Sequence, residues 1–190
     1  MQKRIWIDTE TGGLGFKNPL LQLAYMIELD GRIEEKGVLY AGCFPGDILE
    51  AKALEVNGMD PKEVKDYPPP MESYDKFCSM LQKYVEPYDK KDKLHFVGYN
   101  ARFDMDRLRD WFAKAGDKYF GSWFWFPPLC VMDLAAFYLQ RNRAMMPNFK
   151  LQTVAEALNI KVEPERFHKE PLYDIEITRE IYAKFDDWGS

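Results

Sequence analysis

The sequence predicts an α/β fold in which a mixed sheet is covered by helices. Three strand-like runs open the chain, a fourth follows a helical segment, and several amphipathic segments come after it. This order is typical of helices packed on a sheet. The 190 residues, 46% of them hydrophobic, suffice for one core, and no repeat or linker divides them. We therefore expect a single domain over residues 1–190.

The first three strands are predicted to form an antiparallel meander. The strand candidates are Lys3–Ile7, Leu20–Leu29 and Arg32–Ala41. Asp-Gly at positions 30–31 is a typical two-residue turn between antiparallel strands. A fourth strand is predicted at Leu94–Tyr99, so the sheet should contain the meander and further strands.

Most of the remaining chain is predicted to be helical. Positions 48–66 resemble short helices and loops, and the prolines at 68–70 break the chain. Apolar residues at helical spacing predict helices at Ser73–Val85, Phe103–Lys114, Leu129–Gln140 and Leu151–Leu158, and a last helix from Asp174 with Ile177, Ile181 and Phe185 on one face. These helices should flank the sheet.

Charge and cysteine usage restrict the class of protein. With 31 acidic and 26 basic residues, the net charge of −5 argues against a broad basic face that holds a nucleic-acid duplex. Cys43, Cys78 and Cys130 lack the number and spacing of a disulfide framework or a zinc site. No apolar run approaches the roughly 18 residues of a membrane span, and no secretory segment opens the chain. We expect a soluble, cytoplasmic protein that does not associate with membranes.

Two acidic residues follow the most apolar part of the first strand. Asp8 and Glu10 are two positions apart, so the alternation of a strand points both carboxylates to the same side. Thr11, Gly12 and Gly13 follow, and glycines allow a ligand to approach the backbone closely. Taken alone, an acid-x-acid pattern is weak evidence, because a solvated strand end looks the same.

Two later acidic residues lie on the apolar faces of predicted helices, where a charged side chain is unusual. Asp104 shares the apolar face of its helix with Leu108 and Trp111, and Asp174 lies on the apolar face of the last helix. Each could simply cap a helix or interact with its dipole. Buried carboxylates near one another raise each other's pKa, however, and divalent cations compensate such crowding. The four acids together therefore favour a magnesium or manganese site.

Three motifs in these positions resemble those of the DEDD exonuclease superfamily, of the DnaQ-like type. Residues 6–14 are similar to its first motif, usually DTETTG and an apolar residue, residues 97–104 to its second, and residues 168–174 to its third. The resemblance implies an RNase H-like sheet and two Mg²⁺ or Mn²⁺ ions held by Asp8, Glu10, Asp104 and Asp174. It also implies release of 5′-mononucleotides from single-stranded or frayed 3′ ends of DNA, with RNA also possible, alone or with a separate polymerase or repair partner.

The sequence departs from the family pattern at two points. Gly12 replaces a threonine of the first motif. The family's histidine normally precedes the last aspartate by five residues, where this chain has Lys169, and His168 precedes it by six. The resemblance thus assigns the general base to His168, through a longer loop, with Lys169 as the alternative.

The resemblance also assigns the substrate contacts to Thr11, Leu14, Asn100 and Phe103. Ordinary structural roles compete with it: Leu14 and Phe103 could pack in the core, and Asn100 could be a turn residue. The aromatic run at positions 123–126 is expected to be core, although exposed aromatic residues could stack bases.

Two other functions use similar features. An aspartyl-phosphate phosphatase also places an acid after its first strand, but it needs Asp-x-Asp, and here the second acid is Glu10. A non-catalytic nucleic-acid or protein-binding module gains nothing from four converging carboxylates. The sequence therefore favours the exonuclease.

Overall fold

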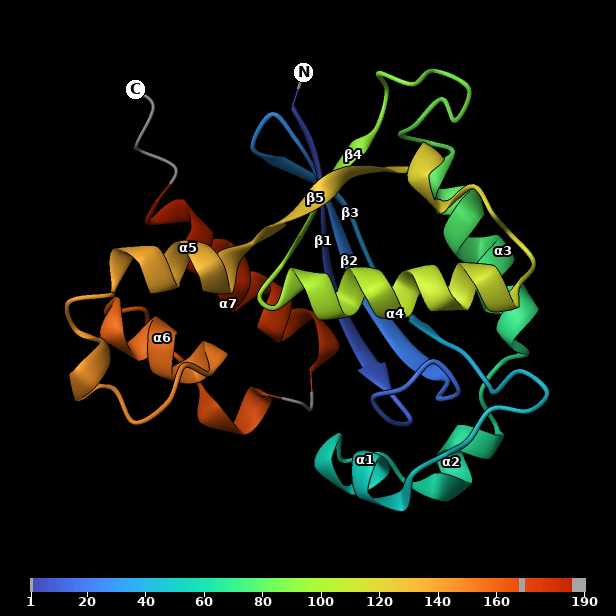
Figure 1. The fold of residues 1–190 in the computed structure, drawn as a ribbon, viewed down its shortest axis with the longest axis horizontal. Helices are drawn as coiled ribbons and strands as arrows, with labels where there is room; N and C mark the ends of the chain where they lie inside the picture. Colours follow the sequence, from blue (N-terminus) through green and yellow to red (C-terminus); the bar gives the residue numbers. More distant parts are fainter. Residues whose placement is uncertain (1, 168–169, 186–190) are drawn as a thin grey trace.

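The computed structural model describes residues 2–167 and 170–185, with a five-stranded sheet between helices on both of its faces (Figure 1). The sheet order is β3-β2-β1-β4-β5. The strands are β1 (Lys3–Thr11), β2 (Leu20–Leu29), β3 (Arg32–Tyr40), β4 (Leu94–Gly98) and β5 (Phe124–Cys130).

The first three strands form the predicted antiparallel meander. β1 pairs with β2 and β2 with β3, both antiparallel, whereas β4 runs parallel to β1 and to β5. Asp30 and Gly31 have φ angles of 46° and 85°, the positive values that the short turn between β2 and β3 requires. The mixed sheet is thus confirmed.

Alternating side chains of the central strands build a core on each face of the sheet. Ile5 and Ile7 of β1 point to a core shared with α3 (Pro70–Leu81) and α4 (Ala101–Lys114). Trp6 points to the opposite core, which α5 (Val131–Tyr138), α6 (Leu151–Ala157) and α7 (Pro171–Ala183) cover. Because both faces are buried, the acids on β1 can reach solvent only at the end of the sheet.

Short helices complete the chain. α1 (Ala51–Val56) and α2 (Pro61–Lys65) lie beyond the end of β1 (Figure 1). Their residues Leu54 and Val64 form a small apolar cluster with Leu21 of β2. Short 3₁₀ turns occur at Phe120–Ser122, Arg143–Met145 and Pro164–Arg166. No helix in the described ranges has the length and apolar character needed to cross a lipid bilayer.

The helix predicted at Leu129–Gln140 was partly wrong, because its first residues belong to β5. Leu129 and Cys130 pair with β4 residues Val97 and Gly98. Pro127 and Pro128 cannot continue a helix but are tolerated on an edge strand. The aromatic run before them is divided: Trp123 and Phe124 are core, as expected, whereas Phe126 is 64% exposed.

Prolines also account for two shifted helix starts. α3 begins at Pro70, three residues before the predicted start, and α7 begins at Pro171, also three residues early. Proline suits the first helical position, where its missing N–H would have no helical partner. β1 extends to Thr11, so Asp8 and Glu10 lie within the strand and not after it.

Candidate active site

Parallel pairing of β1 with β4 brings the acids of the first two motifs together. Arg4 and Trp6 of β1 pair with His95 and Val97 of β4, so both strands run toward the same end of the sheet. The chain then enters α4, whose first turn contains Asp104. β1 continues beyond this point and presents Asp8 and Glu10 there. Asp174 approaches from the first turn of α7.

Asp8 lies at the electrostatic centre of this group. Burial is the largest influence and raises its pKa well above the usual value, and the negative charges of Asp104, Asp174 and Glu10 raise it further. All four predicted acids therefore interact at one place.

Asp104 is held by the strand that it faces. It is only 5% exposed, and its Oδ1 accepts hydrogen bonds from Thr9, at 3.0 Å from the backbone N–H and 2.7 Å from the hydroxyl. Burial raises the pKa of Asp104 to about 7, although the bonds from Thr9 act in the opposite direction. Thr9 thus fixes the direction of this carboxylate.

The chemistry of these acids fits a hard divalent cation. They offer only carboxylate oxygens, which suit Mg²⁺ or Mn²⁺, and a cation would relieve the repulsion around Asp8. In residues 2–167 and 170–185, however, no three acidic, histidine or cysteine side chains converge closely enough to form a metal-binding group. The acids interact through their charges, while Asp104 remains turned toward Thr9.

A cavity of about 450 Å³ opens beside the acids, between the loop after β1 and helix α1. We call it the Leu14 cavity. Its walls combine Glu10 and Thr11 with apolar side chains that include Leu14, Phe103 and Val56. Leu14 is 78% exposed, so it is not a core residue. An apolar slot next to carboxylates can hold a flat, partly apolar ligand such as a nucleobase.

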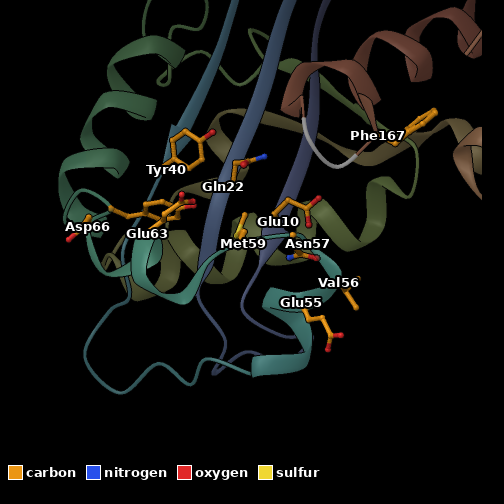
Figure 2. A pocket seen from close by; sticks show the side chains of 12 residues that line it. Glu10, Gln22, Tyr40, Glu55, Val56, Asn57, Met59, Glu63, Asp66 and Phe167 are labelled. Atoms are coloured by element: carbon orange, nitrogen blue, oxygen red, sulfur yellow. The ribbon is translucent and has the colours of Figure 1, made fainter. Parts of the chain in front are cut away.

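A second and larger cavity adjoins the first at Glu10. We call it the Tyr67 cavity; it measures about 720 Å³ and shares Glu10, Val56 and Asn57 with the Leu14 cavity. Figure 2 shows Glu10 from β1 next to Asn57 from the α1 region on its wall, and Phe167, which also lines it, set apart from them. The acidic residues Glu55, Glu63 and Asp66 also line it, so this cavity disfavours a phosphate.

The structure brings three of the four predicted substrate residues to one place. Thr11, Leu14 and Phe103 line the Leu14 cavity. Asn100 is exposed and lines neither cavity. It lies in the turn before α4, which agrees with the alternative role of a turn residue. His168 and Lys169 lie outside the described residues.

Gly12 has a structural reason for its departure from the family pattern. A Cβ at this position would lie 2.8 Å from Cδ2 of Leu49 and 2.9 Å from Cδ of Pro19. The Gly12 carbonyl accepts a hydrogen bond from the N–H of Glu50, which docks the loop against the start of α1. A threonine here would therefore require this segment to move.

Sequence reasoning missed several residues of the site. Asn57 donates a hydrogen bond to the carbonyl of Thr11 at 3.0 Å and forms part of the wall between the cavities. Val56 is 67% exposed beside it. Neither breaks a local pattern, so no signal marked them. Thr9 had a signal, because it lies between two candidate metal ligands.

The sheet order and the helices on both of its faces define an RNase H-like fold, and within it the Asp8 carboxylate interacts with those of Glu10, Asp104 and Asp174. Residues 5–182 match the RNase T family, described as exonuclease, and the chain therefore belongs to this exonuclease family. No curated protein matches the sequence.

Solved structures of exonuclease I share the fold. A complex of the E. coli enzyme with a dT13 oligonucleotide has a TM-score of 0.71 at 17% identity, over 97% of this chain and 40% of that chain. A zinc-bound complex of the E. coli enzyme with single-stranded DNA has a TM-score of 0.76 at 17% identity, over 99% and 42%. This chain thus spans less than half the length of those proteins.

Proposed function

We propose that this chain is a 3′→5′ exonuclease that removes 5′-mononucleotides from single-stranded DNA. The observation that carries the proposal is the carboxylate of Asp8, which interacts with Glu10, Asp104 and Asp174 next to a cavity of nucleotide size that Glu10 lines. The family supports the reaction class, and the oligonucleotide complex of exonuclease I supports the substrate class.

In this proposal the four acids hold two divalent cations. Bound there, the cations would help activate a water molecule and stabilise the leaving 3′ oxygen, and carboxylates select Mg²⁺ or Mn²⁺. Thr9 keeps the Asp104 carboxylate aligned. Leu14 and Phe103 receive the terminal nucleobase, which places the adjacent phosphodiester at the acids.

We assign the chain to the histidine subclass of the DEDD enzymes, with His168 as general base. The assignment rests on the resemblance of residues 168–174 to the third motif, in which His168 precedes Asp174 by six residues instead of the usual five. A positioned base contributes roughly 10²- to 10⁴-fold, so His168→Ala should lower kcat by that factor, whereas Lys169→Ala should have little effect. A loss below about tenfold in His168→Ala would remove His168 from the reaction.

Turnover of matched oligonucleotides tests the function and the substrate class together. We expect Mg²⁺- or Mn²⁺-dependent release of mononucleotides from single-stranded DNA, slower release from RNA of the same sequence, and loss of both in EDTA or in Asp8→Asn. Faster turnover of RNA would reassign the substrate. Failure to release mononucleotides from either strand would favour a non-catalytic binding module.

A further inference from the structure

Arg107 on α4 contacts two of the residues that line the Leu14 cavity, Leu14 and Phe103, and is not among the lining residues itself. Its Nη1 donates a hydrogen bond to the carbonyl oxygen of Leu14 at 3.0 Å, across 93 positions of sequence. Its guanidinium lies 5.8 Å from the centroid of the Phe103 ring, one helical turn earlier. One side chain thus links the loop after β1 to the helix that carries Asp104.

The hydrogen bond from Arg107 restrains the part of the loop after β1 that contains Leu14. The base of the loop is fixed by Asn18, which accepts a hydrogen bond from the N–H of Gly15 and donates to the carbonyls of Gly12 and Ile48. Leu14 itself is 78% exposed, so little burial holds its side chain in place. The hydrogen bond from Arg107 therefore restrains the apolar side chain that the base must meet.

The guanidinium of Arg107 is itself well fixed. Its side chain is only 16% exposed, and Nη2 lies 2.9 Å from Oδ2 of Asp110 on the next turn. The planar guanidinium can serve both partners at once, because its donors diverge at fixed angles. A lysine at this position has a single nitrogen to divide between them.

We propose that Arg107 is a positioning residue that sets the separation of Leu14 and Phe103, and thereby the fit of the substrate's terminal nucleobase between them. This rests on the proposed exonuclease function and deepens it. Arg107 acts through the two walls and does not touch the reacting phosphodiester. Its contribution should therefore depend on whether the terminal nucleotide carries a base.

Two substrates separate this role from general stabilisation. The first is a single-stranded DNA oligonucleotide, and the second is the same strand with an abasic 3′-terminal nucleotide. Losing a hydrogen bond from a charged donor corresponds to about a tenfold effect, so Arg107→Met should lower kcat/KM about tenfold on the first substrate. On the abasic strand the loss should be below about twofold. Arg109→Met, an exposed arginine two positions along α4, is the matched control and should leave both rates unchanged.

A double-mutant cycle with Leu14→Ala completes the test. In the Leu14→Ala background, Arg107→Met should lower kcat/KM on the normal strand little further, because both changes disrupt the same contact between Leu14 and the terminal base. Arg107→Lys keeps the charge and should show a smaller loss with the same dependence on the base, and it carries the test if Arg107→Met does not fold. Equal losses on both substrates, or additive losses in the cycle, would overturn the positioning role. An inactive wild-type protein would instead overturn the exonuclease function.

Discussion

Replacing Asp104 by Asn should stabilise the metal-free protein at alkaline pH. The folded protein raises the pKa of Asp104 from 3.8 to about 7. At 1.36 kcal/mol per pKa unit, ionising this buried carboxyl costs roughly 4 kcal/mol above pH 7. The stability that the protonated form provides is complete below the unfolded pKa near 3.8 and is lost as pH rises toward 7. Asn does not ionise, and its carbonyl can still accept both bonds from Thr9.

Urea unfolding in EDTA at pH 4 and pH 8 measures this effect. Asp104→Asn should gain up to about 4 kcal/mol at pH 8, or roughly 10 °C in Tm for a chain of this size, and almost nothing at pH 4. Asp106→Asn, on the exposed side of the same helix, is the control and should change stability by less than about 1 kcal/mol. Added Mg²⁺ should stabilise the wild type more than Asp104→Asn. A variant less stable than wild type at pH 8, or a gain that does not change with pH, would refute the reasoning.

Two further predictions concern named hydrogen bonds. Thr9→Val removes the hydrogen bond from the Thr9 hydroxyl to Asp104 and should lower kcat about tenfold. Thr9→Ser keeps the hydroxyl and should retain activity. Equal rates in the two variants would show that this hydrogen bond is unimportant. Glu28 is buried, which would raise its pKa, but hydrogen bonds from Arg179 and Arg4 outweigh burial and lower it. Glu28→Gln should therefore lower the free energy of unfolding in urea by about 3 kcal/mol at pH 7. The loss should shrink as pH falls below the ordinary glutamate pKa of 4.5. A loss that stays constant across this range would contradict the ion-pair account.

Local signals in the sequence predicted most of the fold. Asp30 and Gly31 predicted the turn between β2 and β3, and alternation along β1 predicted that Asp8 and Glu10 share a side. β5 was missed because a short parallel strand is defined by its pairing with β4, and such a partner is distant in sequence. Its two prolines also conceal a strand pattern.

The candidate site was predictable where a charged side chain occurs in an otherwise apolar sequence pattern. Asp104 had such a signal on its apolar helix face, and the structure places it beside Asp8. Leu14 was predicted only through the resemblance to the family's first motif, and the structure places it on a cavity wall. Asn57 and Arg107 had no signal, because a polar side chain at a helix end or on a helix surface is ordinary. Their roles depend on backbone carbonyls of a distant loop, which only the folded chain brings within reach.

The polarity of strand shortening tests the central claim most directly. A single-stranded DNA labelled at its 5′ end is incubated with the protein and Mg²⁺, and products are resolved at nucleotide steps. We predict a ladder of labelled strands that shorten progressively from the 3′ end, with 5′-mononucleotides released and no reaction by Asp8→Asn. Immediate appearance of a labelled mononucleotide, or cleavage of a circular strand, would contradict the proposed 3′→5′ exonuclease.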